Sequence, residues 1–207
     1  MITTNEMRFL EEKSERQGIS KLQLMENAGK CIYTVIKERF PDLKGKKVLV
    51  ACYHGNNSGD GFVVARYLCE ECETDVLFVG DETKFKEEAK DNFKKIEHND
   101  LVQLMVEPEQ LAFDYDIIID ALLGTGSSGK LKEPISSLID RINESAAFKI
   151  SIDIPSGLDP DTGEVFDKMI GADLIVTFHD LKNGLEKFKD KVIIVDIGLS
   201  NFSIPQS

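Results

Sequence analysis

From residue 46 onward, the chain alternates short β-branched apolar runs with amphipathic segments of helical length. This alternation is typical of βαβ units, in which parallel strands form a sheet and the helices between them cover its faces. The pattern therefore predicts an α/β fold, a three-layer αβα sandwich with a mostly parallel sheet. Strands are expected at about 46–53, 75–80, 101–106, 115–123, 148–155, 173–179 and 191–198, and helices between them at about 61–72, 83–97 and 133–145.

Two further helical stretches precede the alternating region, at about 4–17 and 20–40, with Gly18 between them. The second stretch opens with a capping-box pattern, Ser20 to Gln23, and carries an apolar stripe at helical spacing. Such a stripe predicts packing against the sheet. The expected organisation is one domain over 1–207, with a helical extension at 1–40 and an α/β core at 46–198.

The net negative charge of the chain argues against some classes of binding partner. With a formal net charge of −12 over 207 residues, the chain is poorly suited to nucleic acid, whose phosphates must be neutralised on binding. Its longest apolar runs are far shorter than the roughly 20 residues that a membrane span requires. We therefore expect a cytoplasmic protein with neither a nucleic-acid nor a membrane partner.

Cys69 and Cys72 have the C-x-x-C spacing of redox and metal sites. A zinc site would need a second ligand pair, which Cys31 and Cys52 do not supply. The redox motif normally opens a helix, whereas this pair falls near the end of one. The four cysteines are therefore interpreted as incidental.

Ligands of open parallel sheets bind at the carboxyl ends of the strands, so the loops that follow strands are the candidate sites. The first such loop, Gly55-Asn-Asn-Ser-Gly-Asp-Gly61, leads into a predicted helix. A helix N-terminus presents free backbone N–H donors and the positive end of the helix dipole, which together can hold phosphate. The alternative is a tight turn in which Asp60 merely caps the helix.

The second loop, Asp120-Ala-Leu-Leu-Gly-Thr-Gly-Ser-Ser-Gly129, contains the G-x-G-x-x-G spacing of dinucleotide-binding dehydrogenases. That fingerprint belongs to the first βα turn of its unit, whereas this loop follows three earlier strands. Asp153, further along the chain, could still imitate the acid that binds the ribose. An NAD(P)-dependent oxidoreductase therefore remains an alternative.

The third loop spans residues 151–163 and contains Asp153 at the end of a largely apolar strand. A carboxyl group in such surroundings is suited to proton transfer near neutral pH. Asp159 and Asp161, further along the loop, are typical of ordinary turns. Asp153 is therefore the acid–base candidate.

Asn57, Asp120 and Ser156 place one side-chain oxygen in each of the three loops. If the three strands are neighbours, one carboxylate with several neutral oxygens would suit a large, weakly charged cation. Mg²⁺ and Ca²⁺ usually recruit more carboxylates. The loops therefore predict a candidate cation site.

Six stretches of the chain carry a family resemblance. They are Leu24-Met-Glu-Asn-Ala-Gly29, the Gly55 loop with Ala65-Arg66, Asp120-Ala-Leu-Leu-Gly-Thr-Gly126, Asp153-Ile-Pro-Ser-Gly-Leu-Asp159, Thr177-Phe-His179 and Val195-Asp-Ile-Gly198. In these stretches the chain resembles the NAD(P)HX epimerase family, also called the YjeF N-terminal domain. The resemblance extends in order over almost the whole chain, which makes it highly specific.

The resemblance implies an isomerase that interconverts the R and S epimers of hydrated NADH and NADPH, known as NADHX and NADPHX. These damaged cofactors carry a hydroxyl group at carbon 6 of the reduced ring. A partner dehydratase, on a separate chain or in a missing domain, then restores the S form. The implied fold is Rossmann-like, commonly a homodimer, and the implied cofactor is one potassium ion per subunit. A non-catalytic nucleotide-binding protein on the same fold is a further alternative.

The resemblance also implies roles for individual residues. Asp153 would contact the reacting nicotinamide end as the catalytic group, and Asn57, Asp120 and Ser156 would bind potassium. The implied substrate contacts besides Asp153 are Asn56, Asn57, Ser58, Gly59, Asp60, Gly124, Thr125, Gly126, Ser127, Ser128, Gly129 and Lys130.

Two stretches depart from the family pattern. Ser58 stands where glycine is usual, which matters if that residue needs a positive φ or lies against a phosphate. Asp180-Leu-Lys-Asn-Gly184 replaces a segment usually written with alanine and prolines. Within it, Lys182 would either pair with a ligand phosphate or lie on the solvated surface.

Overall fold

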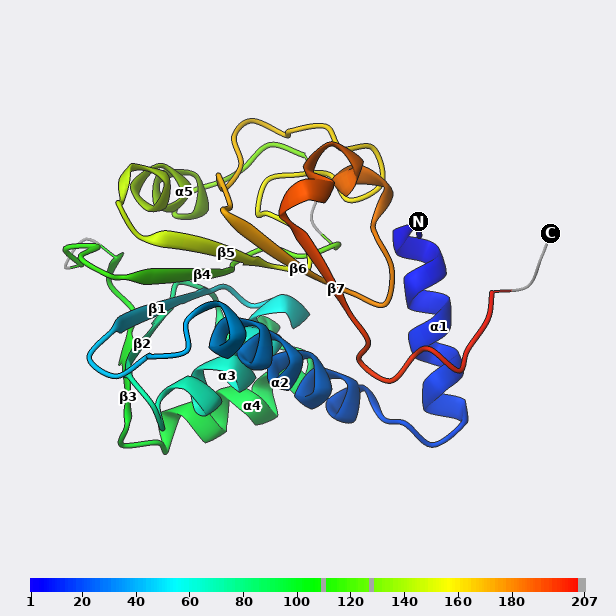
Figure 1. Cartoon of the computed structure of the whole chain (residues 1–207), viewed down its shortest axis with the longest axis horizontal. Helices are drawn as coiled ribbons and strands as arrows, with labels where there is room; N and C mark the ends of the chain where they lie inside the picture. The colour runs from blue at the N-terminus through cyan, green and yellow to red at the C-terminus, as the bar shows by residue number, and fades with distance from the viewer. Residues whose placement is uncertain (109–110, 127–128, 205–207) are drawn as a thin grey trace.

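The computed structural model of the chain describes residues 1–108, 111–126 and 129–204, and one sheet of seven strands lies at its centre (Figure 1). Every neighbouring pair of strands is parallel. The α/β fold class and all seven predicted strands are thereby confirmed. The strands are β1 (Lys47–Cys52), β2 (Glu73–Phe78), β3 (Val102–Met105), β4 (Ile117–Ala121), β5 (Phe148–Ile152), β6 (Leu174–Phe178) and β7 (Val192–Val195), in the spatial order β3-β2-β1-β4-β5-β6-β7.

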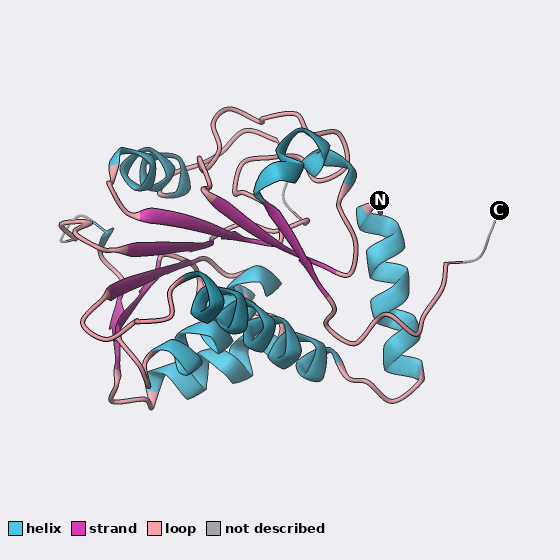
Figure 2. Ribbon diagram, viewed as in Figure 1, coloured by secondary structure: helices cyan, strands magenta, loops and turns pink. Residues whose placement is uncertain are grey.

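Helices cover both faces of this sheet (Figure 2). They are α1 (Thr4–Arg16), α2 (Lys21–Arg39), α3 (Asn56–Leu68), α4 (Glu87–Glu97) and α5 (Ile135–Glu144), with the 3₁₀ helices η1 (Glu82–Lys84) and η3 (Asn183–Lys191). The helices α2, α3 and α4 lie on one face, and α5 and η3 lie on the other, which gives the three predicted layers. The helix α1 stands outside these layers, at the edge of the molecule. The 3₁₀ helix η3 has no counterpart in the sequence-based prediction.

The sheet is buried on both faces because the side chains of each strand alternate between two apolar clusters. In β1, Val50 belongs to the cluster shared with α2, α3 and α4, whereas Leu49 belongs to the cluster shared with α5. In β4, Ile119 and Ile118 divide in the same way. This double burial explains why the strands consist of nearly continuous apolar runs.

The helix α3 begins earlier than the sequence predicts. Expected at 61–72, it spans Asn56–Leu68, so most of the Gly55 loop is helical. Gly55, not Asp60, is the N-cap, and no side chain caps this helix. The glycines inside α3 permit close packing instead of a turn, because a Cβ atom on Gly61 would lie 2.7 Å from a side-chain atom of β4.

Close packing of α2 against α3 depends on Gly29, where a Cβ atom would overlap the side chain of Val63. Alanine at position 29 is therefore expected to lower the free energy of unfolding by about 1–3 kcal/mol, even though alanine favours helices. Urea denaturation measures the change. Gly171→Ala is the matched control, because a Cβ atom there would lie at an ordinary contact distance of 3.4 Å from Asn143 Oδ1. Equal stability of the two variants would contradict the packing account.

Candidate functional site

The strand order brings the three candidate loops to one edge of the sheet. The chain passes outward from β1 to β2 and β3, returns to β4 beside β1, and continues outward through β5, β6 and β7. Ligands of doubly wound sheets bind where the order reverses in this way, here between the carboxyl ends of β1 and β4. The register sets Asp120 of β4 beside Ala51 of β1 and Ser151 of β5.

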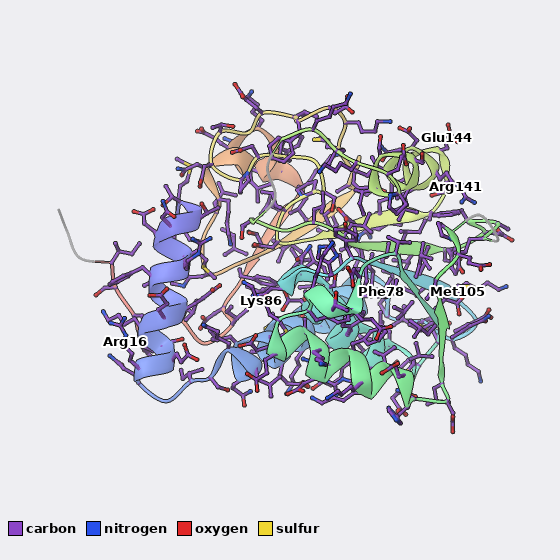
Figure 3. The ribbon with its side chains drawn as sticks, turned by 180° about the vertical axis from the view of Figure 1, so that it is seen from behind. Arg16, Phe78, Lys86, Met105, Arg141 and Glu144 are labelled. Carbon is purple, nitrogen blue, oxygen red and sulfur yellow. The ribbon has the colours of Figure 1, made fainter. Side chains whose placement is uncertain are left out.

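A cavity of about 580 Å³ lies at this edge of the sheet. Its walls come from α1 and α2, the start of α3, the segment after β4, and Asp153 after β5. Lys86, which precedes α4 and is labelled in Figure 3, also lines it. The cavity therefore gathers residues from both the N-terminal extension and the α/β core.

The predicted substrate contacts divide between the cavity wall and its surroundings. Gly129 and Lys130 are exposed and are not part of the lining. Ser127 and Ser128 fall outside the described residues. Ser58 and Gly59 are buried and do not line the cavity. The predicted contacts that do line it are Asn56, Asn57, Asp60, Gly124, Thr125, Gly126 and Asp153.

Ser58 is fully buried near the start of α3. Its hydroxyl group donates to the carbonyl oxygen of Ala121 at 2.9 Å and accepts from the backbone N–H of Tyr53 at 2.7 Å. These two bonds tie the end of β1 to the end of β4. The side chain therefore points into the protein, and its helical backbone needs no positive φ.

Asp120 is fully buried at the end of β4. Its carboxylate accepts hydrogen bonds from Ser156 Oγ at 2.5 Å, from Ser156 N at 2.8 Å and from Ser151 Oγ at 2.8 Å. Burial raises the pKa of Asp120, and the hydrogen bonds from Ser156 and Ser151 oppose that rise. The carboxyl group thus holds the loop after β5 against β4.

Asn57 and Ser156 meet at the backbone of Leu123. Asn57 Nδ2 donates to the Leu123 carbonyl oxygen at 3.0 Å, and Leu123 N donates to Ser156 Oγ at 2.9 Å. The three predicted cation ligands, Asn57, Asp120 and Ser156, therefore belong to one connected network. One carboxylate beside hydroxyl, amide and carbonyl oxygens fits a weakly charged cation. Within the part of the chain that the structure describes, no group of three or more His, Cys, Asp and Glu side chains is placed to hold a metal ion.

Asp153 follows β5 in the left-handed region of backbone conformation, with a φ of 63°, and only 8% of its surface is exposed. Its Oδ1 atom accepts a hydrogen bond from Thr177 Oγ1 at 2.9 Å and one from Phe178 N at 3.3 Å. Lys182 Nζ lies 2.7 Å from the same oxygen. Three donors therefore converge on one oxygen and fix the orientation of the Asp153 carboxyl group.

Lys182 is fully buried, so the expected position on the solvated surface is wrong. The ion pair with Asp153 also occupies the ammonium group that was a candidate for a ligand phosphate. Its Nζ atom donates further to the carbonyl oxygen of Phe178, at 2.8 Å. One sequence signal could have found this pair, because Asp153 and Lys182 follow strands that are neighbours in the sheet.

The N-terminal extension docks beside Lys182. Ile2 pairs with Lys182 in a parallel bridge, and Thr4 Oγ1 donates to Asp161 Oδ2 at 2.6 Å. Through these contacts α1 forms one wall of the cavity, to which it contributes Glu11. Sequence reasoning found the helix but missed its place at the site, since nothing in the sequence indicates where it docks.

The G-x-G-x-x-G spacing after β4 does not open a helix. The helix α5 begins at Ile135, well beyond Gly129, whereas the dehydrogenase fingerprint leads directly into its helix. The first βα turn of this sheet is instead the one between β1 and α3. The geometry therefore gives the oxidoreductase alternative no support.

A known family matches most of the chain. The profile of the family described as "YjeF-related protein N-terminus" matches residues 21–184. The chain belongs to this family. The resemblance expected from the sequence is thereby confirmed.

Relatives of this YjeF-related chain carry epimerase and repair-enzyme names. An NAD(P)H-hydrate epimerase from Nitrosopumilus maritimus is 38% identical over 192 residues, which cover 91% of this chain and 89% of that protein. A bifunctional NAD(P)H-hydrate repair enzyme Nnr from Archaeoglobus fulgidus is 37% identical, and the match covers 100% of this chain but only 42% of that enzyme. The crystal structure of the yeast protein ynu0, YNL200c, shares the fold, with a TM-score of 0.82 at 22% identity over 95% of this chain and 87% of the yeast chain.

The cysteines of this YjeF-related chain are all free thiols. Cys69 is the C-cap of α3, so the C-x-x-C pair lies at the end of a helix, as the sequence predicts. Among residues 1–108, 111–126 and 129–204, no helix is both long and apolar enough to cross a membrane.

Lys182 is predicted to stabilise this YjeF-type fold through Asp153. Lys182→Met leaves a buried carboxylate without its counter-charge, which is expected to lower the free energy of unfolding by about 3–5 kcal/mol. Adding Asp153→Asn removes the uncompensated charge, so the double variant should be more stable than Lys182→Met alone. Urea denaturation of both single variants and the double variant measures the coupling. Strictly additive losses would contradict a direct ion pair.

Proposed function

We propose that this chain is an NAD(P)H-hydrate epimerase, an isomerase that interconverts the R and S forms of NADHX and NADPHX in nicotinamide cofactor repair. The observation that carries the proposal is Asp153, a nine-tenths buried carboxylate that lines the cavity where the family's strand-end motifs converge. Family membership supports the proposal, and so does the match to the epimerase from Nitrosopumilus maritimus across about nine tenths of both chains.

Epimerisation at carbon 6 requires little machinery. This carbon bears both a hydroxyl group and the ring nitrogen, so its C–O bond can break with help from the nitrogen lone pair. A proton donor assists the departing oxygen, and a proton acceptor takes the proton of the water that returns on the other face. Opening of the ring through the C–N bond would also need an acceptor, for the proton of the hydroxyl group, and a donor, for the ring nitrogen that leaves. Asp153, held in place by Lys182, supplies one of these groups.

The rest of the dinucleotide is proposed to lie along the cavity wall. Asn56 and Asn57 line the cavity in the first turn of α3, where free N–H groups and the positive end of the helix dipole favour a phosphate. Arg8 and Lys86 add positive charge to the same wall, which offsets the acidic balance of the whole chain. Within the predicted segments 56–60 and 124–130, the proposed contacts are the residues that line the cavity: Asn56, Asn57, Asp60, Gly124, Thr125 and Gly126.

A potassium ion is proposed to bind at Asn57, Asp120 and Ser156. Support comes from their shared network around Leu123 and from the burial of Asp120, whose carboxylate has hydrogen-bond donors but no lysine or arginine partner among the described residues. When bound, the ion would neutralise this carboxylate and hold the loops after β4 and β5 together.

The partners and the location of the protein are proposed on separate grounds. Bifunctional relatives such as the Archaeoglobus fulgidus enzyme suggest a dehydratase as the functional partner, on another chain or in another domain. A homodimer is supported by the edge strand β7, whose Ile193 and Ile194 are 40% and 48% exposed. A cytoplasmic location is supported by the four free cysteines, because thiols persist in reducing compartments.

Asp153→Asn is expected to remove most of the epimerase activity. Asparagine tolerates the left-handed backbone of this position but cannot transfer a proton, so the acceleration should fall by about 10²–10⁴-fold. The measurement is a coupled assay on mixed NADHX epimers, in which an S-specific dehydratase in excess reports the conversion of the R epimer. Asp173→Asn is the matched control, because Asp173 is an exposed carboxylate that bonds Lys149 N at the opposite end of the sheet.

Two results would count against this proposal. If the wild-type protein leaves the spontaneous epimerisation rate unchanged, the proposed function is contradicted. Tight binding of the nucleotide without any effect on this rate would favour the non-catalytic alternative. An Asp153→Asn protein that epimerises NADHX as fast as the wild type would contradict the catalytic role of Asp153.

Potassium is expected to raise the melting temperature of the protein more than an equal concentration of lithium. The reason is that the network at Asp120 offers several neutral oxygens to a large cation and only one carboxylate. Differential scanning fluorimetry at constant ionic strength measures the difference. Asp120→Asn should abolish the preference for potassium. Identical melting temperatures of the wild-type protein in the two salts would contradict the site.

A further inference from the structure

Asp60 is a second carboxyl group in the cavity, and its surroundings differ from those of Asp153. It lies in α3, lines the cavity and is only 9% exposed. Within the described part of the chain, its carboxyl group has neither a hydrogen-bond partner nor an ion pair. The side chain is therefore polar, buried and unpartnered, and it borders the space that the substrate is proposed to fill.

The absence of donors around Asp60 favours its neutral form. Burial raises the pKa of Asp60 well above the usual range for aspartate, and the negative charges of Asp153 and Glu11 raise it further. Glu11 faces the same space from α1, and burial followed by the charge of Asp153 raises its pKa as well, while Lys182 opposes that rise. Burial, the lack of hydrogen-bond donors and the neighbouring carboxyl groups therefore all favour the protonated form of Asp60.

The two carboxyl groups match the two requirements of the reaction. Asp153 accepts hydrogen bonds from Lys182, Thr177 and Phe178 and is suited to be the base, whereas Asp60 holds a proton and is suited to be the acid. Pairs of titratable groups in opposite environments identify acid and base in this way.

Resting on the proposed function, we propose that Asp60 is a second catalytic residue, the proton donor to the departing hydroxyl group. Asp60 gives its proton to the oxygen on carbon 6, the C–O electron pair leaves with water, and the nitrogen lone pair forms a C=N bond. Water then adds to carbon 6 from the opposite face and passes a proton to Asp153, while the C=N electron pair returns to nitrogen. At the end of the reaction Asp153 carries the proton and Asp60 has lost it, which is the arrangement needed for the reverse direction. Proton exchange with solvent restores the starting state.

The test is the pH dependence of kcat and KM for the wild-type protein, Asp60→Asn and Asp60→Glu in the coupled assay. Asparagine keeps the shape and the hydrogen-bonding capacity of the neutral acid but cannot release a proton, so kcat should fall by about 10²–10⁴-fold with little change in KM. Asp60→Glu should restore part of kcat. Because Asp60 acts while protonated, wild-type kcat/KM should fall as pH rises through its pKa, and this fall should be absent from the residual activity of Asp60→Asn.

Asp75→Asn is the matched control for the loss of a buried carboxyl group. Asp75 is buried on β2, outside the cavity lining, where Tyr115 OH donates to it at 2.7 Å, and burial raises its pKa too. Its kcat and pH profile should match those of the wild type. Thermal unfolding of each variant verifies that it is folded.

The outcomes separate this role from the proposed function. If the wild-type protein does not accelerate epimerisation, the proposed function itself is contradicted. If it does, an Asp60→Asn protein with wild-type kcat and pH profile overturns the role of Asp60 alone, and so does a change confined to KM. Should Asp60→Asn fail to fold, a wild-type kcat/KM that shows no alkaline fall overturns the role without any variant.

Discussion

The ion pair between Asp153 and Lys182 is the interaction on which the rest of the site depends. The only buried lysine side chain among the described residues gives this buried carboxyl group its counter-charge. The pair fixes the end of β5 to the segment after β6. The same segment receives the N-terminus through the bridge between Ile2 and Lys182. One buried contact therefore positions both the carboxyl group of Asp153, the proposed catalytic group, and the cavity wall that α1 provides.

The polar interior of the site contains two networks with different tasks. Around Asp120, hydrogen bonds from Ser151 and Ser156 connect the ends of β4 and β5 through oxygens of a kind suited to a weakly charged cation. Around Asp153, Lys182 forms an ion pair with one carboxyl group, while Asp60, which lines the same cavity, lacks any such partner among the described residues. A rigid parallel sheet can hold these environments side by side because its strands end at a common edge.

The strands were predictable because both faces of the sheet are buried, which makes each strand a short, nearly continuous apolar run. The start of α3 could not be predicted in this way, because glycine is common both in turns and where helices pack closely. At Gly29 and Gly61, close packing is recognised only from contacts with residues that are distant in the sequence, Val63 and Ala121. Lys182 was misplaced for a related reason: its partner lies across a strand crossover, and a lysine is normally exposed. The roles of Asp153 and of the candidate cation ligands rest on the family resemblance as much as on their positions after strands.

The most direct test of the central claim is a crystal structure of Asp153→Asn with NADHX bound. The account predicts the reduced nicotinamide ring in the cavity at the ends of β1, β4 and β5, with carbon 6 beside residue 153 and its hydroxyl group within hydrogen-bonding distance of Asp60 or residue 153. Lys182 should remain buried behind residue 153, out of contact with the phosphates. A nicotinamide ring outside this cavity, or an adenine base in its place beside residue 153, would contradict the account.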